Sequence, residues 1–229
     1  LSWAANKGQL EIVKTLLEWG ANINACHQVN KFSVLHQSIA SKHEVVTLEL
    51  IKAEADINQA TAEGLNPFAL ACAHKLKAIA LTIVEHQKFN PLMVDIKGFN
   101  SLLWSLEFKD SELAEKIIKL GGTDINYQDK DGKTALFWSV AYNLPQTVEL
   151  LLGSGAEAII ASKQGFNPWH LAAMQGNIAI LTLIKGQVPD LDIPSNNEIK
   201  ASVLWLAANQ NQLETVKVLA NWGANINYR

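Results

Sequence analysis

The sequence predicts an all-α solenoid, in which antiparallel helix pairs stack in a row and hairpin-like finger loops join them. Two observations predict this fold. Residues 3–24 and 206–227 are identical at 15 of 22 positions, at a fixed offset of 203 residues. Between them, an apolar anchor that follows a turn and opens a short helix recurs every 33 to 35 residues. The anchors are Leu1, Leu35, Phe68, Leu102, Leu136, Trp169 and Leu204.

Each unit repeats the same elements in the same order. A turn such as 131–134 precedes the anchor, and small residues such as Ala4 and Ala5 follow it in a first helix. A second helix carries apolar residues at helical spacing, as in the stretch 10–17. Glycine then ends that helix, where a left-handed conformation costs little only for glycine, and a polar segment with an asparagine leads to the next turn. The ending glycines are Gly20, Gly121, Gly155 and Gly223.

These motifs resemble those of the ankyrin-repeat family. The stretches 33–36, 134–136 and 167–170 are degenerate copies of that family's Thr-Pro-Leu-His turn, and 20–24 and 223–227 match its closing segment. The resemblance covers the chain in seven units and implies a single ankyrin-repeat domain, 1–229, which we expect to be a fragment of a longer array. The expected units are approximately 1–27, 28–60, 61–94, 95–128, 129–161, 162–196 and 197–229.

Composition excludes several classes of protein. The chain is 48% hydrophobic with a formal net charge of −3, so it is neither a disordered chain nor a generally cationic nucleic-acid binder. No apolar run approaches the roughly 20 residues that span a bilayer, so no membrane insertion is expected. Two cysteines cannot build a disulfide framework, which favours a reducing, cytoplasmic location, or the host cytosol for a secreted effector. We expect a monomer.

No pattern in the sequence predicts catalysis, a cofactor or a metal. His43 and Glu44 begin a zinc-protease motif, but Thr47 stands where its second histidine should be. The family resemblance implies that His36 and His170 are structural hydrogen-bonding residues. Cys72 is expected to be a buried packing thiol, and Cys26 to lie on a finger. The tripeptide 66–68 spells an endocytic-adaptor ligand, but Phe68 occupies an anchor slot and should be buried.

The sequence leaves three hypotheses for function. A rigid repeat array without a catalytic set favours a protein-protein interaction scaffold that binds a partner protein or peptide on its concave and finger surface. The alternative is a targeting or regulatory segment of a larger enzyme, a secreted bacterial effector or an endosomal adaptor. A purely structural spacer is the third.

Two positions in each repeat form the candidate binding surface. In arrays that this sequence resembles, the residue three before each anchor lies on a finger and the residue six after it ends the first helix, both facing the concave groove. Large apolar residues fill four of the finger slots here, and two aromatic residues fill adjacent helix slots. A row of such residues marks interaction sites, although the same rings could instead pack between neighbouring fingers. The candidates are Phe32, Leu65, Phe99 and Phe166 on fingers, with Phe108 and Tyr142 on helices.

One residue is a candidate for modification. The stretch 50–58 resembles the asparagine-hydroxylation site of eukaryotic ankyrin fingers, which makes Asn58 the candidate acceptor. The alternative is that Asn58 only satisfies the backbone of its own turn.

Overall fold

The structure is a computed structural model that describes residues 1–109 and 111–228. Within these residues it contains helices and loops without a strand; a single antiparallel bridge joins Cys26 and Ser33. The expected all-α fold is therefore confirmed. No helix in the described ranges combines the length and apolar character that crossing a bilayer requires.

The helices alternate between a first and a second helix of each repeat. The first helices are α1 (Ser2–Asn6), α3 (Val34–Ala40), α5 (Pro67–Ala73), α7 (Ser101–Ser105), α9 (Ala135–Ala141), α11 (Pro168–Met174) and α13 (Val203–Asn209). The second helices are α2 (Leu10–Glu18), α4 (Glu44–Lys52), α6 (Lys77–Val84), α8 (Glu112–Leu120), α10 (Pro145–Gly153), α12 (Ile178–Ile184) and α14 (Leu213–Asn221). Two short 3-10 helices, η1 (Leu106–Phe108) and η2 (Lys185–Gln187), follow α7 and α12.

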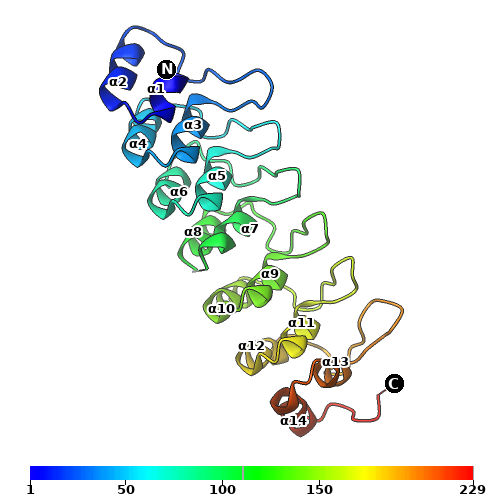
Figure 1. The fold of residues 1–229 in the computed structure, drawn as a ribbon. Coiled ribbons are helices and arrows are strands. Elements are labelled where there is room, and N and C mark those ends of the chain that lie inside the picture. The colour runs from blue at the N-terminus through cyan, green and yellow to red at the C-terminus, as the bar shows by residue number, and fades with distance from the viewer. Residues whose placement is uncertain (110, 229) are drawn as a thin grey trace. The chain divides into compact units, whose positions relative to one another are not determined.

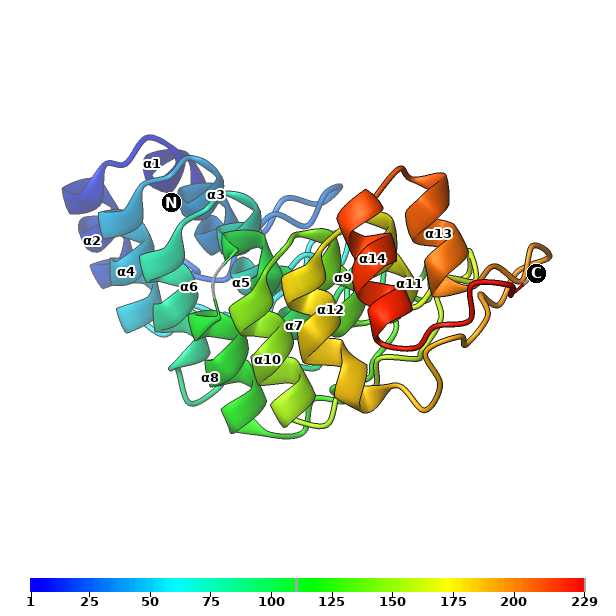
Figure 2. The ribbon, with the colours of Figure 1, turned by 90° about the horizontal axis from the view of Figure 1, so that it is seen from below.

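The chain divides into two compact units. Unit 1 holds residues 1–108 and 119–123, and unit 2 holds residues 109–118 and those from 124 onward. Within unit 1, each of the first helices α1, α3, α5 and α7 packs on the next, and so do the second helices α2, α4 and α6 (Figure 1). Within unit 2, the same holds for α9, α11 and α13, and α12 lies beside α10 (Figure 2). That residues 1–229 form a single domain stays a prediction.

Side-chain caps fix where the first helices begin. A serine, threonine or asparagine stands immediately before each of these helices from α3 to α13, and its side-chain oxygen accepts the backbone N–H three residues later. This bond satisfies one of the donors that a helix start leaves unpaired. Proline occupies the first turn of α5, α10 and α11, where its missing N–H costs nothing. Helix α10 accordingly begins at Pro145.

The anchors form the core of each unit. The side chains of Leu35, Phe68, Leu136 and Trp169 are at most 1% exposed. Burial of each such side chain contributes roughly 1.5–3 kcal/mol to stability. Because a first helix of five to seven residues cannot enclose its anchor alone, the next repeat must cover it.

Glycine at the finger turns allows neighbouring fingers to touch. The N–H of Lys163 donates to the C=O of Asp131 at 2.8 Å, and the N–H of Asn196 donates to the C=O of Gly165 at 2.7 Å. Gly165 has a φ of +83°, and a Cβ atom built on it would lie 2.5 Å from the carbonyl carbon of Asn196. Only a residue without a Cβ fits this position.

We expect Gly165→Ala to destabilise unit 2 more than Gly155→Ala does. Gly155 also has a positive φ, +90°, but no atom lies within 4 Å of a Cβ built there. Both changes carry the cost of a left-handed alanine, about 1 kcal/mol, and only Gly165→Ala adds a backbone clash. Urea unfolding followed by circular dichroism should show a loss of about 2 kcal/mol or more for Gly165→Ala. Equal midpoints for the two variants would show that the finger contact is dispensable.

Candidate functional site

Aspartate side chains shape two of the fingers, one of which carries the candidate residue Phe99. In unit 2, Oδ1 of Asp129 accepts the backbone N–H groups of Asp131 and Lys133 at 2.8 and 2.9 Å. In unit 1, Oδ1 of Asp95 accepts those of Lys97 and Phe99 at the same two distances. Each carboxylate therefore closes its own turn and fixes the residue three before the anchor.

The predicted finger aromatics pack on the first helix of their own repeat. The ring of Phe99 contacts Trp104 edge-on with a centroid distance of 5.7 Å. Phe32 lies 5.6 Å from the ring of His36, and Phe166 lies 6.4 Å from the ring of His170. All three phenylalanine rings are half-buried. The structure thus places them at the junction of finger and helix, with one side still open to solvent.

The other three candidates are half-buried as well. Leu65 contributes its backbone C=O to a hydrogen bond with His36, described below. Tyr142 caps the C-terminus of α9, and its ring lies 5.6 Å from that of Trp138. The prediction that Phe108 ends a first α-helix is wrong. Helix α7 ends at Ser105, and Phe108 is instead the last residue of the 3-10 helix η1. Such a turn satisfies helix-terminal carbonyls with shorter-range bonds.

Two tryptophans that the sequence analysis missed complete the aromatic surfaces. Trp104 in unit 1 and Trp138 in unit 2 occupy the same slot, two residues after the anchor. Nε1 of Trp138 donates to Oδ2 of Asp129 at 2.8 Å, and Nζ of Lys133 lies 4.6 Å above the indole ring. The spacing of four residues between Trp138 and Tyr142 was the available signal, because such pairs share one helix face.

Buried histidines join one repeat to the next. Nδ1 of His36 accepts the N–H of its N-cap residue, Ser33, at 3.2 Å, and Nε2 donates to the C=O of Leu65 in the following repeat at 3.1 Å. His170 repeats this arrangement with Asn167 and Ile193 at 3.4 and 2.8 Å. The expected structural role of both histidines is confirmed.

Burial favours the neutral form of both imidazoles. It lowers the pKa of His36 from 6.5 to about 4, against a smaller opposing effect of the hydrogen bond to Leu65. Burial lowers the pKa of His170 in the same way. The geometry gives the same direction, because a proton added at Nδ1 would point at the backbone N–H that this atom accepts.

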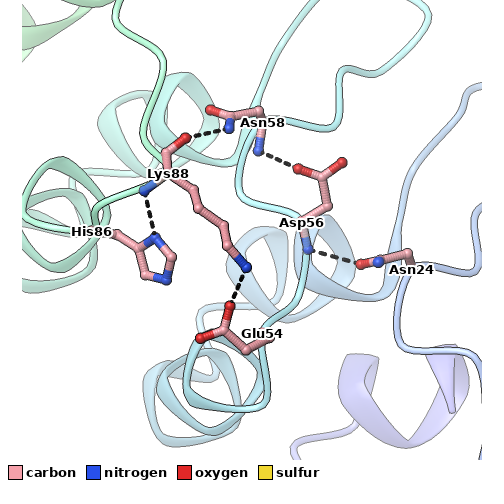
Figure 3. A network of polar contacts seen from close by, with 6 residues as sticks. All are labelled: Asn24, Glu54, Asp56, Asn58, His86 and Lys88. Atoms are coloured by element: carbon pink, nitrogen blue, oxygen red, sulfur yellow. Dashed lines mark hydrogen bonds and ion pairs between the residues drawn. The ribbon is translucent and has the colours of Figure 1, made fainter.

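A ladder of side-chain amides connects the closing segments of unit 1 (Figure 3). Oδ1 of Asn24 accepts the N–H of Asp56 in the next repeat at 2.8 Å, and Oδ1 of Asp56 accepts the N–H of Asn58 at 2.9 Å. Asn58 continues the ladder, because its Oδ1 accepts the N–H of Asn90 at 2.9 Å and its Nδ2 donates to the C=O of Lys88 at 2.6 Å. The side chain of Asn58 therefore bonds to backbone groups of the next repeat, and the side chain that closes its own turn is that of Asp56.

The same hydrogen bonds between closing segments recur in unit 2, and they depend on the residue at one position of the repeat. Asn126 accepts the N–H of Glu157 at 2.9 Å, and the carboxylate of Asp192 accepts the N–H of Asn225 at 2.9 and 3.0 Å. Leu92 and Ile159 occupy the same slot without an acceptor atom, and their side chains are 57% and 39% exposed. An amide or carboxylate oxygen at this position is therefore what forms the hydrogen bond between adjacent closing segments.

The structure also places the two cysteines and the 66–68 tripeptide. Cys72 is buried, and burial raises the pKa of its thiol well above the usual value, whereas Cys26 is exposed, as expected for both. Phe68 is fully buried, so the 66–68 tripeptide is not accessible. Among the described residues, no three histidine, cysteine or acidic side chains gather as a metal site would require.

Comparison with known families agrees with the repeat geometry. The model of three ankyrin-repeat copies matches residues 1–95 and 102–197, and the single ankyrin-repeat model matches residues 201–229. The chain belongs to the ankyrin-repeat family. Ankyrin repeats generally mediate protein-protein interaction.

Solved structures show the same fold. The ankyrin-repeat domain of human ASB11 aligns with a TM-score of 0.74 and 22% identity, over 95% of this chain and 96% of that domain. An ankyrin-repeat domain from Acinetobacter baumannii aligns with a TM-score of 0.72 and 24% identity, over 81% of this chain and 96% of that one.

Curated relatives differ widely in length. The nuclear factor NF-kappa-B p105 subunit of Gallus gallus is 29% identical over 79% of this chain and 19% of its own length. Human Rabankyrin-5 is 32% identical over 69% of this chain and 14% of its own length. The putative ankyrin repeat protein YahD of Escherichia coli is 28% identical over 79% of this chain and 92% of its own length. The chain therefore spans a quarter or less of several relatives, including the palmitoyltransferase AKR1 of Lachancea kluyveri, and most of YahD.

We expect His36 to make the stability of unit 1 fall as the pH falls from 6.5 towards 4. Because the folded state holds His36 with the lower pKa, protons bind the unfolded chain first and favour unfolding in this window. The shift corresponds to a loss of about 3 kcal/mol at most. Urea midpoints at a series of pH values should show that His36→Gln, which stays neutral and can accept the cap N–H, flattens this dependence.

The matched control is His27→Gln, which changes an exposed histidine on the first finger. It should leave the pH dependence as in the unchanged chain. A pH profile that His36→Gln does not alter would show that the buried imidazole is not held neutral.

Proposed function

We propose that this chain is a non-catalytic scaffold that binds a partner protein or peptide through its finger and first-helix residues. The observation that carries the proposal is the recurrence of half-buried aromatic residues at two fixed slots of the repeat. In unit 1 these are Phe99, whose ring contacts Trp104, and Phe108; in unit 2 Tyr142 lies beside Trp138. Rings held in place by neighbouring rings lose little conformational freedom when a partner covers them, which favours their use as binding hot spots.

The geometry in unit 2 adds a charge to this surface. Lys133 has a side chain that is 18% exposed, and its ammonium group lies over the face of Trp138 and 3.4 Å from the carboxylate of Asp131. The indole is held in turn by its hydrogen bond to Asp129. A partner that reaches this surface meets an aromatic face with a fixed cation, an arrangement that suits an apolar side chain next to a hydrogen-bond acceptor.

The second candidate function is a targeting or regulatory segment of a larger enzyme, a secreted effector or an endosomal adaptor. It is supported by the small share of the longer relatives that the chain covers, 14% of Rabankyrin-5 and 25% of a palmitoyltransferase. In that case the same aromatic surface would recruit a substrate or hold a further domain. The full-length reading frame distinguishes the two candidates.

We expect the double change Phe99→Ala and Phe108→Ala to weaken partner binding about tenfold or more. Partners captured from lysate by the unchanged chain and identified by mass spectrometry would be purified, and the dissociation constants of both proteins measured by calorimetry. The matched control is Ile12→Ala with Val45→Ala, which removes exposed apolar side chains, 48% and 65% exposed, from α2 and α4. That control should bind as the unchanged chain does.

Thermal melts of the double variant show whether a change in partner binding reflects a lost contact or a loss of stability. If the Phe99→Ala, Phe108→Ala protein melts early, the rings brace the array and the binding site lies elsewhere. If it melts normally and binds at full strength, the aromatic surface of unit 1 takes no part in binding.

Asn58 is the proposed acceptor for hydroxylation. Its Cβ carries an amide that already bonds Asn90 and Lys88, so a hydroxyl on Cβ can leave both hydrogen bonds in place. Incubation with an asparaginyl hydroxylase should add about 16 Da to the peptide that contains Asn58 and nothing to the same peptide from Asn58→Ala. An unchanged mass for the unmodified sequence would dispose of this proposal.

A further inference from the structure

The aromatic surface of unit 2 holds a cation where that of unit 1 holds a ring. The residue three before the anchor is Phe99 in unit 1 and Lys133 in unit 2. The ammonium nitrogen of Lys133 lies 4.6 Å from the ring centroid of Trp138 and 5.9 Å from that of Phe137. Because the Lys133 side chain is only 18% exposed, this charge is largely covered by the protein.

One buried carboxylate fixes both the lysine and the ring beside it. Oδ1 of Asp129 accepts the backbone N–H of Lys133 at 2.9 Å, and Oδ2 accepts Nε1 of Trp138 at 2.8 Å. Asp129 is 6% exposed. The backbone of the lysine and the plane of the indole are therefore set before a partner arrives, which lowers the entropic cost of binding.

The ammonium group of Lys133 has more donors than acceptors. It carries three N–H donors. Among the described residues, its one hydrogen-bond acceptor is Oδ2 of Asp131, at a distance of 3.4 Å, which is long for such a bond. The side chain of Asp131 is 61% exposed, and an ion pair of this kind contributes at most about 1 kcal/mol. A second carboxylate can therefore displace Asp131 at little cost.

Further lysines stand beside this group. Lys130 is exposed on the same finger, and Lys163 is exposed on the next finger. The N–H of Lys163 donates to the C=O of Asp131 at 2.8 Å, and its Cγ lies 3.4 Å from a Cβ built on Gly132. Across these two fingers, 129–133 and 162–166, Asp131 is the one exposed acidic residue among three lysines.

The helices that follow these fingers contribute rings rather than charges. Helices α9 and α11, residues 135–141 and 168–174, contain no Asp, Glu, Lys or Arg. Trp138 and Tyr142 are half-buried, with ring centroids 5.6 Å apart. This part of unit 2 thus combines an aromatic surface with an excess of positive charge.

We propose that the partner of this surface is an acidic peptide segment. A Glu or Asp carboxylate of the segment bonds the ammonium group of Lys133, and a neighbouring apolar side chain packs on Trp138 and Tyr142. This inference rests on the proposed scaffold function and adds the chemistry of the partner. The segment complements the lysines in charge, and the low exposure of Lys133 strengthens the pairing because water screens it less.

A nucleic acid is the less suitable anion for this surface. Asp131 stands among the lysines, and the chain as a whole carries a net charge of −3, whereas phosphate backbones are bound by extended rows of cations.

Peptides selected on the full chain from a displayed library of random sequences test this inference. The enriched peptides should carry Asp or Glu next to an aromatic or aliphatic residue. Calorimetry with one such peptide should show about tenfold weaker binding to Lys133→Met, which removes the charge but keeps the apolar stem. Lys133→Arg should retain most of the affinity, because a guanidinium group is also cationic and stacks on aromatic rings.

Asp131→Asn should have the opposite effect. It removes the carboxylate that competes for the ammonium group, so the acidic peptide should bind about threefold more tightly. A purely structural role of this finger does not predict tighter binding. The matched control is Lys217→Met, which removes a lysine that is 57% exposed from α14 of the same unit. That control should bind the peptide as the unchanged chain does.

Thermal melts establish that each variant is folded, and Asp131→Asn with Lys133→Arg carry the test if Lys133→Met melts early. Selected peptides without acidic residues would overturn this inference and leave the scaffold function standing. An unchanged affinity in Lys133→Met would overturn it as well, and so would a single-stranded oligonucleotide that binds more tightly than the acidic peptides. A library that yields no binder also overturns it, whereas the scaffold function fails only if capture from lysate returns no partner.

Discussion

The stacking of one repeat on the next is the constraint on which the rest of this structure depends. The helices are five to nine residues long, shorter than the roughly 12–15 residues at which an isolated helix becomes stable in water. Anchors such as Leu35 and Trp169 reach full burial only because a neighbouring repeat covers them. Caps, turns and glycines matter chiefly because they keep successive repeats at the spacing that this burial requires.

Polar links between repeats add what apolar stacking cannot supply, namely a fixed register. A buried imidazole such as His36 reaches one carbonyl of the next repeat, and an amide such as Asn58 reaches one N–H. Each link satisfies backbone groups that would otherwise lack a partner in a loop. Because each link needs only one suitable side chain, the repeats can differ greatly in sequence while keeping the same geometry, as Leu92 and Ile159 show where the link is absent.

Much of the fold could be predicted from the sequence because its signals are periodic. The anchors, the left-handed glycines and the buried histidines each recur with the repeat, and the structure has all of them. The amide ladder could not be predicted in the same way, since its two ends lie about one repeat apart and an asparagine has many possible partners. In the candidate surface, the repeat spacing predicted Phe99 and Tyr142 but not Trp104 and Trp138. The role of the two tryptophans depends on their ring contacts with Phe99 and Tyr142, which only the structure shows. The 3-10 helix that ends at Phe108 could not be predicted from residue types alone.

The two cysteines differ in a way that gives the chain a built-in labelling position. Cys72 is enclosed in the first helix of its repeat, and its thiol keeps its proton, so it resists alkylation in the folded protein. Cys26 is exposed and forms the antiparallel bridge of the first finger with Ser33. A thiol-reactive dye or spin label therefore attaches to a single site on the native chain without any engineered cysteine. Its signal would report on the motion of that finger and on anything that docks beside it.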